Sequence, residues 1–323
     1  MTWLPILLLL AGVLAFLPFV LRGSELVRVR NAFLFDAAAA EDFEWIPGSE
    51  PPSFKRELNA PGSTFVQACE SLQIDQIEGD WQRALVLGRH LLSAVGEEPG
   101  GPIQAGLEET YRRIVGEGQG YCADFVDVYA ALALAAGLQV RIWAFSFDGF
   151  GGHGHTFNEV WDEADREWKA IDVYNNYLFI DEDGKPMSAS AFHRDLLSTT
   201  PSYRLWPVAG DARPGFIYEN VARDYYARGA TQWYLWMGVN VFSVATDPVV
   251  RWLSRYSNML AQLMAMARGL HPRILAVEMR ENRAFCGRMK ALRRRLSFSG
   301  LAMAVGAAAL LVNLGMAGNP RGG

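Results

Sequence analysis

An uncharged apolar segment stands near each end of this 323-residue chain. The first runs from Trp3 to Leu21, and the second runs from Leu296 to Pro320. An apolar helix of about 20 residues, rising about 1.5 Å per residue, is long enough to cross the hydrocarbon core of a bilayer. The two segments therefore predict transmembrane helices at residues 1–22 and 296–318, with the rest of the chain held between them.

Each segment has an alternative interpretation. A cleaved signal peptide would have a basic residue before its apolar run and small residues at its cleavage site, and the first segment has neither. The second segment could be a buried helix of a soluble domain, but three arginines stand directly before it, at residues 293–295. Its many glycines and alanines suit close packing in lipid, for example against Gly12 of the first segment. We expect an anchor in both cases.

The distribution of Lys and Arg gives an orientation. No basic residue precedes the first span, whereas Arg22, Arg28 and Arg30 follow it. Nine Lys or Arg residues lie between Arg268 and Arg295, before the second span, and a single arginine, Arg321, follows it. Because basic flanks stay on the cytoplasmic side, we expect a two-span protein of the cell (inner) membrane. Its central domain would be cytoplasmic, and both termini would lie outside.

A third uncharged segment, from Ala230 to Thr246, complicates this topology. It is short for a span, and it contains the polar residues Gln232 and Asn240. Its tryptophans and tyrosine suit a membrane interface. We expect it to lie at the interface or to pack on the domain, and a third span stays open as the alternative.

The composition is that of a folded protein. Half of the residues are hydrophobic, 20% are charged, and the net charge is −5, so nothing in the overall charge indicates a nucleic-acid partner. The three cysteines, Cys69, Cys122 and Cys286, are far apart and odd in number. This pattern is neither a disulfide framework nor a zinc motif, and it fits a reducing compartment or a cysteine kept for chemistry.

Between the predicted spans, residues 23–78 have the Pro and Gly clusters of a juxtamembrane connection, and residues 79–205 form the predicted domain. Apolar spacing predicts helices in this domain at residues 81–95, 103–115 and 121–136. Alternation then predicts strands at residues 138–147, 155–161 and 167–173, the last two joined by a polar hairpin turn. We therefore expect an α+β domain with an antiparallel sheet.

Residues 206–295 are predicted to be a helical or interfacial region. Asp247 and Pro248 form a helix start signal, with Asp as the N-cap and Pro at the first helical position. The apolar, Met-rich stripe that follows, at residues 252–264, is interpreted as core. A basic helix from Ile274 to Arg295 is expected to lead into the second span.

The first candidate for chemistry is Cys122, which follows a glycine-rich turn and opens a predicted helix. Free backbone N–H groups and the positive end of the helix dipole favour the reactive thiolate at such a position. The alternative is a buried structural cysteine, which is common for an isolated Cys. The segment around Cys122 does not by itself decide between them.

Two further residues favour the catalytic interpretation. His155 begins one predicted strand, and Asp172 ends the next, which is joined to it by the hairpin turn. Adjacent antiparallel strands can place these side chains together. A carboxylate beside an imidazole fixes its tautomer, and the imidazole can then activate a thiol.

These motifs resemble the transglutaminase-like superfamily, in its bacterial cysteine-protease-like branch. The matching residues are Gly120–Cys122, Gly137–Arg141, His155–Trp161 and Trp168–Asp172. The resemblance extends from about Glu108 to Tyr177. It implies a papain-like α+β core, in which the helix that carries the cysteine packs on an antiparallel sheet. It also implies Cys122 as the nucleophile, His155 as the general base and Asp172 as the residue that orients the base.

The chemistry that the resemblance implies is acyl transfer through a thioester, with no cofactor. We expect a membrane-anchored cysteine protease, amidase or transglutaminase-type acyltransferase that acts on peptide or amide bonds, with hydrolysis favoured over crosslinking. The alternative is a non-catalytic scaffold or partner-binding subunit of a membrane assembly, because a fold does not guarantee its chemistry. A membrane partner is possible in either case.

Other residues are assigned auxiliary roles. The backbone N–H of Cys122 and the side chain of Gln119 are candidate oxyanion donors. Tyr121 and Trp168 are candidate walls of the site, and core packing is the alternative for both. A second histidine, His153, would need further ligands to hold a metal, so no metal site is predicted. We expect His153 to lie in a glycine-rich lip over the site.

Overall fold

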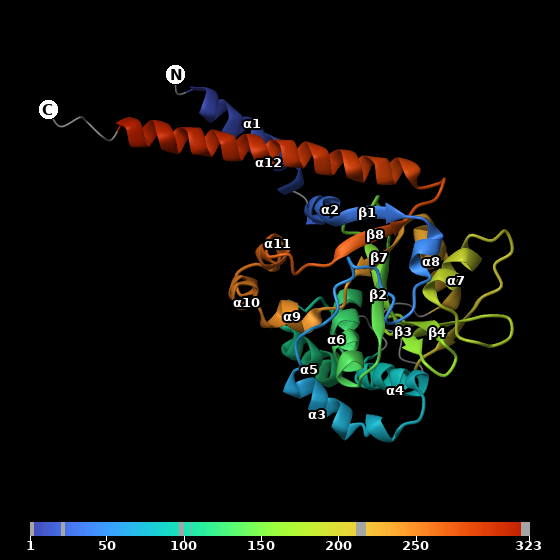
Figure 1. Cartoon of the computed structure of the whole chain (residues 1–323). Helices are drawn as coiled ribbons and strands as arrows, with labels where there is room; N and C mark the ends of the chain where they lie inside the picture. Colours follow the sequence, from blue (N-terminus) through green and yellow to red (C-terminus); the bar gives the residue numbers. More distant parts are fainter. Residues whose placement is uncertain (1–2, 21–22, 97–99, 104, 211–217, 318–323) are drawn as a thin grey trace.

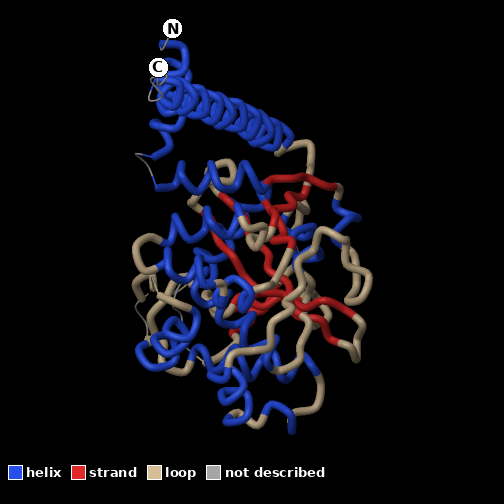
Figure 2. Tube along the Cα trace, turned by 60° about the vertical axis from the view of Figure 1, so that its left-hand side comes forward, coloured by secondary structure: helices blue, strands red, loops and turns tan. Residues whose placement is uncertain are grey.

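An eight-stranded sheet runs through the folded domain, between the helices (Figures 1 and 2). The computed structural model describes residues 3–20, 23–96, 100–103, 105–210 and 218–317. The strand order is β1-β8-β7-β2-β3-β4-β5-β6, and every neighbouring pair is antiparallel except β1 and β8, which are parallel. The strands are β1 (Phe35–Ala38), β2 (Val140–Ser146), β3 (Gly154–Asp162), β4 (Glu167–Asp172), β5 (Tyr177–Ile180), β6 (Arg204–Pro207), β7 (Trp233–Met237) and β8 (Arg273–Val277).

Helix α6 (Cys122–Ala135) packs against β2 and β3 on one face of the sheet. Its alanine-rich sequence lets it approach the strands closely, and most of its residues from Phe125 onward are buried. Gly137 follows it with a φ of +75°, the left-handed conformation that is common just beyond a helix end. The other helices of this layer are α3 (Ser63–Ser71), α4 (Asp80–Leu92), α5 (Leu107–Glu117) and α9 (Val241–Thr246).

The opposite face of the sheet buries a cluster of aromatic side chains. Helices α7 (Ala189–Leu196) and α8 (Glu219–Gly229) cover it, together with the 3-10 turn η1 (Ala40–Phe43). Two further 3-10 turns are η2 (Ile74–Gln76) and η3 (Ala230–Gln232). The mixed α+β architecture expected from the sequence is therefore confirmed.

The elements predicted between residues 79 and 173 are present, with small shifts at their ends. The helix expected at residues 103–115 begins later, at Leu107. The turn between β3 and β4 is the expected hairpin, and Arg166 takes the left-handed conformation in it, with a φ of +54°. The change from helical to strand periodicity in the sequence was therefore a sound guide.

The region after residue 205 differs from its prediction. The segment from Ala230 to Thr246 contains β7, a central strand with Trp233 and Leu235 fully buried. It therefore packs in the domain, which is one of the two placements expected for it, and the alternative of a third span is wrong. The basic helix expected from Ile274 is also wrong at its start, because Arg273–Val277 forms β8. Two strands of the domain sheet therefore lie in a region predicted to be helical. Aromatic residues suit a buried strand as well as a membrane interface, which explains why the sequence left both placements open.

The predicted juxtamembrane connection also contributes to the fold. Helix α2 (Gly23–Leu34) follows the first apolar segment, and β1 directly after it pairs with β8 at the edge of the sheet. The chain segments before and after the predicted domain thus both contribute strands to the same sheet.

The Met-rich stripe forms two short helices, α10 (Pro248–Ser254) and α11 (Asn258–Ala267). Asp247 caps α10 as predicted, because its side chain accepts hydrogen bonds from the N–H groups of Val249 (3.1 Å) and Val250 (3.0 Å). The interpretation of the stripe as core is wrong, because Trp252 and Tyr256 are 54% and 72% exposed.

The two apolar ends pack against each other as helices α1 (Trp3–Val20) and α12 (Arg283–Ala317), which project from the domain (Figure 1). Gly12 permits this contact, as expected, because a Cβ atom there would lie 2.1 Å from Cγ of Met303. Gly306 faces the backbone of Pro5 in the same way, at 2.8 Å. The basic and apolar segments at the C-terminal end form the single helix α12.

The two predicted spans are supported to different degrees. Within the described part of the chain, α12 is the one helix that is long and apolar enough to cross a membrane alone, over Arg283–Asn313. Helix α1 meets the same criterion only together with α2, from which it is bent by 115°. Two transmembrane helices are thus not confirmed. Arg22 and Arg321, which entered the orientation count, lie outside the described residues.

Candidate active site

Cys122 is the first residue of α6, and Tyr121 is the N-cap. Gly120 makes the turn into the helix with a φ of +121°. The carboxylate of Asp124 fixes this turn, because it accepts hydrogen bonds from the N–H groups of Tyr121 (2.8 Å) and Ile103 (3.1 Å). The thiol is partly accessible, and it stands where the first N–H groups of the helix have no partner within the helix.

His155 and Asp172 lie on neighbouring strands. Asn158 of β3 is opposite Ile171 of β4, so by strand alternation His155 is one diagonal step from Asp172 on the same face of the sheet. Nε2 of His155 is 2.6 Å from Oδ2 of Asp172, and both side chains are buried. The other ring nitrogen, Nδ1, remains for the thiol of Cys122.

The charges around His155 favour its protonated form. Burial by itself would lower the pKa of His155, but the negative charge and the hydrogen bond of Asp172 oppose it. A hydrogen bond and the charge of Cys122 act in the same direction, and the net effect raises the pKa of His155 above its ordinary value. Such an environment stabilises the imidazolium form of His155.

Two residues at this site were not identified from the sequence. Nδ2 of Asn175 is 2.9 Å from Oδ2 of Asp172 and 3.2 Å from Nε2 of His155. The phenol of Tyr226, on α8, donates to the same oxygen of Asp172. Asn175 directly follows the Asp172 strand, so its proximity could have been noticed. Nothing in the sequence connects Tyr226 with this strand.

Aromatic rings enclose the imidazole of His155. The ring of Tyr225 meets it edge-on with centroids 5.6 Å apart, and Phe145 lies at 5.5 Å. Burial and the nearby charge of Cys122 raise the pKa of Tyr174 to about 12, and the same causes raise the pKa of Tyr225. Both phenols are therefore neutral at physiological pH and can act as hydrogen-bond donors.

The structure places the three auxiliary candidates differently. Tyr121 directly precedes Cys122 as the N-cap of α6, and its side chain is 47% exposed. Gln119 is held through its side-chain oxygen by the guanidinium of Arg113. Trp168 is at the far end of β4 from Asp172, where its Nε1 donates to the carbonyl oxygen of Trp45 (2.9 Å). The structure therefore does not bring Trp168 to the site, and the core-packing alternative holds for it.

A buried ion pair supports β3 beyond the site. Glu159 faces the same side of the sheet as His155 and pairs with the guanidinium of Arg141, and both side chains are almost fully buried. Nε1 of Trp143 (2.7 Å) and the N–H of Ala189 (2.7 Å) also donate to this carboxylate. The carboxylate of Glu159, on β3, therefore links this strand to two side chains of β2 and to the first residue of α7.

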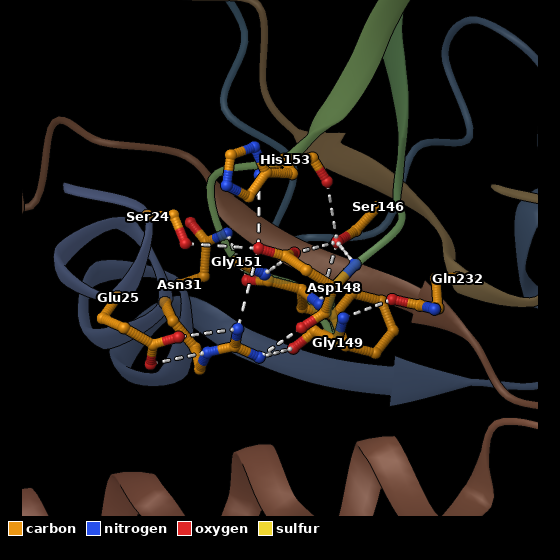
Figure 3. Close-up of polar contacts among 11 residues, drawn as sticks. Ser24, Glu25, Asn31, Ser146, Asp148, Gly149, Gly151, His153 and Gln232 are labelled. Carbon is orange, nitrogen blue, oxygen red and sulfur yellow. Dashed lines mark hydrogen bonds and ion pairs between the residues drawn. The ribbon is translucent and has the colours of Figure 1, made fainter. Parts of the chain in front are cut away.

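The loop between β2 and β3, at residues 147–153, contains three glycines, and its role as a lip over Cys122 stays a prediction. The carboxylate of Asp148 accepts hydrogen bonds from the hydroxyl of Ser146, at the end of β2 (2.8 Å), and from the N–H of Gly151 (2.9 Å) in the loop (Figure 3). The side chain of His153 is exposed. Among the described residues, no group of three or more His, Cys, Asp or Glu side chains could hold a metal ion.

Side chains of helix α2 donate hydrogen bonds to the backbone of this loop. The guanidinium of Arg28 donates to the carbonyl oxygens of Asp148 and Gly149, the latter at 3.0 Å (Figure 3). Nδ2 of Asn31 donates to the carbonyl oxygen of Phe150 (2.8 Å). The helix that follows the first apolar segment thus contacts the loop that leads into the His155 strand.

A family model, described as transglutaminase-like superfamily, matches residues 102–173. The matched segment contains α5, α6 and β2 to β4, and Cys122, His155 and Asp172 all fall within it. Neither the search of curated proteins nor the search of solved structures gave a match. Residues 102–173 are therefore similar to the transglutaminase-like superfamily.

Proposed function

We propose that this protein is a membrane-anchored cysteine enzyme that cleaves peptide or amide bonds and transfers the acyl group to water or to an amine. The observation that carries the proposal is the 2.6 Å contact between His155 and Asp172 beside a thiol at the start of a helix. Nucleophile, base and orienting carboxylate are then Cys122, His155 and Asp172. The family match supports this assignment, because it spans all three residues.

The arrangement accounts for each proton in the reaction. The thiolate of Cys122 attacks the amide carbonyl carbon, while the thiol proton resides on His155. When the tetrahedral intermediate collapses, His155 gives this proton to the leaving amine, and the acyl group remains as a thioester. Neutral His155 then takes a proton from water or from an acceptor amine, which attacks the thioester and regenerates the thiolate. Asp172 holds the imidazole and stabilises its charged form.

The oxyanion of the tetrahedral intermediate requires hydrogen-bond donors. The backbone N–H of Cys122 suits this role, because it is among the first N–H groups of α6. Gln119 is the second candidate. Its side-chain oxygen is engaged by Arg113, which leaves the amide N–H groups for the substrate.

Membrane attachment is part of the proposal. The apolar length of α12 and its packing against α1 support an anchor formed by both helices. The excess of Lys and Arg before residue 296 supports a cytoplasmic domain. A cysteine-accessibility scan tests this orientation, and reaction of the domain with a membrane-impermeant reagent from outside would contradict it.

Covalent labelling with a thiol-directed amide mimic tests the chemistry. Wild type should be labelled at Cys122, and Cys122→Ala should lose labelling while its near-ultraviolet circular dichroism stays unchanged. Cys69→Ala is the matched control and should retain labelling, because burial and nearby carboxylates raise the pKa of Cys69 to about 11. Unchanged labelling of Cys122→Ala would refute the nucleophile. If wild type is labelled, peptides whose abundance differs between cells with wild type and cells with Cys122→Ala would identify substrates. A wild type that resists every such probe would favour the non-catalytic scaffold.

A further inference from the structure

The helices α10 and α11 expose an apolar face that the domain leaves uncovered. Their inward side is small, formed by Val250, Ala261 and Ala265, which are buried against each other. Their outward side carries large side chains, which are 42 to 72% exposed. We call this set the aromatic face: Trp252, Tyr256, Leu260 and Leu263. An apolar face of this kind on a soluble surface marks an interaction site.

The chain segment that carries the aromatic face has basic residues and no acidic ones. The sequence contains no Asp or Glu from Pro248 to Val277. Arg251 and Arg255 adjoin the face, are exposed, and have no ion-pair partner among the described residues. Arg268, in contrast, is paired with Asp247 (2.8 Å). The face therefore presents apolar and aromatic groups with two free guanidinium groups beside them.

Contacts within the chain place this face next to the proposed anchor. Nη1 of Arg30, on α2, donates to the side chain of Gln262 on α11 (2.8 Å). Helix α2 begins three residues after α1 ends, so α11 is fastened to the segment that emerges from the first apolar helix. Figure 1 shows α10 and α11 on the side of the domain toward which α1 and the C-terminal half of α12 project.

We propose that α10 and α11 dock into the interfacial layer of a bilayer that contains anionic lipids. Tryptophan and tyrosine concentrate in this layer because one part of each ring is apolar and the other part polar. Arginines beside them bind lipid phosphates, and this attraction grows with the content of anionic lipid. The location rests on the proposed anchoring by α1 and α12, and the docking adds a second contact that fixes how the domain sits on the membrane.

The test uses the full chain, reconstituted in vesicles, with Cys122→Ser to remove the reactive thiol. An environment-sensitive fluorophore is attached at Tyr256→Cys, and at Thr199→Cys as the matched control. Thr199 is exposed in the loop that follows α7, and Figure 1 shows α7 on the opposite side of the domain from α10 and α11. Vesicles contain either neutral lipid or a mixture with anionic lipid, and brominated lipids serve as quenchers.

The proposal predicts that the label at residue 256 is quenched by brominated lipid and shifts its emission to the blue, whereas the label at residue 199 does neither. Arg251→Gln and Arg255→Gln should each reduce the docked fraction in anionic vesicles, with the docking equilibrium lowered roughly fivefold per arginine, and have little effect in neutral vesicles.

Flotation of the vesicles separates docking from anchoring. Protein that floats with the vesicles but shows no quenching at residue 256 would overturn the docking and leave the anchoring intact. Protein that does not float would overturn both. A label at residue 256 that is equally shielded in detergent, without vesicles, would indicate a protein partner on this face and would also overturn the proposal.

Discussion

The phenol of Tyr226 donates a hydrogen bond to the carboxylate of Asp172, which lies 54 residues earlier in the chain. Tyr226 is fully buried on α8, and α8 lies outside the segment that matches the family model. Nδ2 of Asn175 donates to the same carboxylate oxygen. The residue that orients the imidazole is therefore itself held by two side chains from beyond the matched core.

Replacement of Tyr226 by Phe tests this support. A buried hydrogen bond to a charged acceptor contributes about 1.5–3 kcal/mol, so Tyr226→Phe should lower the free energy of unfolding by about that amount. It should also slow covalent labelling of Cys122, because Asp172 would hold His155 less firmly. Chemical denaturation and labelling rates measure the two effects. The exposed Tyr218→Phe is the control, and identical values for both variants would refute the role of the phenol.

The three candidate catalytic residues could be predicted from the sequence, whereas the side chains that hold them in place could not. Cys122, His155 and Asp172 each stand at an end of a regular element, and a change of periodicity marks these ends. Tyr226 reaches the site through a tertiary contact of α8, for which local sequence has no signal. Trp168 was misplaced for a related reason, since an aromatic side chain on a strand looks the same whether it lines a site or packs in the core.

Asp172→Asn should narrow the pH range of activity. The carboxylate raises the pKa of His155 in the wild type, so the imidazolium, which in the proposed mechanism protonates the leaving amine, persists above pH 6.5, the ordinary value. Without the charge, the basic limb of the profile of kcat/KM against pH should move to lower pH. Because the pKa of His155 is raised in the folded protein, protonation of its imidazole also stabilises the fold. This contribution is complete below pH 6.5 and is lost as the pH rises through the raised pKa. A basic limb that stays in place would contradict this electrostatic role.

Glu159→Gln should destabilise the domain strongly. It would leave the buried guanidinium of Arg141 without its counter-charge, and breaking a buried ion pair on one side lowers stability by about 3–5 kcal/mol. Glu219→Gln is the matched control, because its pair with Arg223 is at the surface and such pairs contribute about 0.2–1 kcal/mol. Equal losses of free energy of unfolding in the two variants would show that the buried pair has no special role.

Arg28→Gln should loosen the loop before the His155 strand. Its guanidinium joins α2 to the carbonyl oxygens of Asp148 and Gly149. Losing these contacts, at about 1–1.5 kcal/mol, should speed amide hydrogen exchange at residues 148–153 by roughly tenfold. Arg56→Gln, which removes an ion pair with Glu50 elsewhere on the surface, is the control. Exchange that is unchanged in Arg28→Gln would show that α2 does not restrain the loop.

Regions outside the core were harder to predict because one pattern fits several environments. The uncharged segment with Trp233 is a central strand, although its composition also suits a membrane interface. The stripe that begins at Trp252 has the spacing of a core helix, yet it points outward. Periodicity identifies which face of an element is apolar, and only the tertiary structure shows whether protein covers that face.

The pairing of Cys122 with His155 is the central claim, and the pH dependence of alkylation tests it most directly. The rate of modification of Cys122 by iodoacetamide is measured by peptide mass spectrometry between pH 4 and pH 10, in wild type and in His155→Ala. The imidazolium stabilises the thiolate, so the midpoint of the profile in His155→Ala should move to higher pH. Coincident profiles in the two proteins would contradict the pairing.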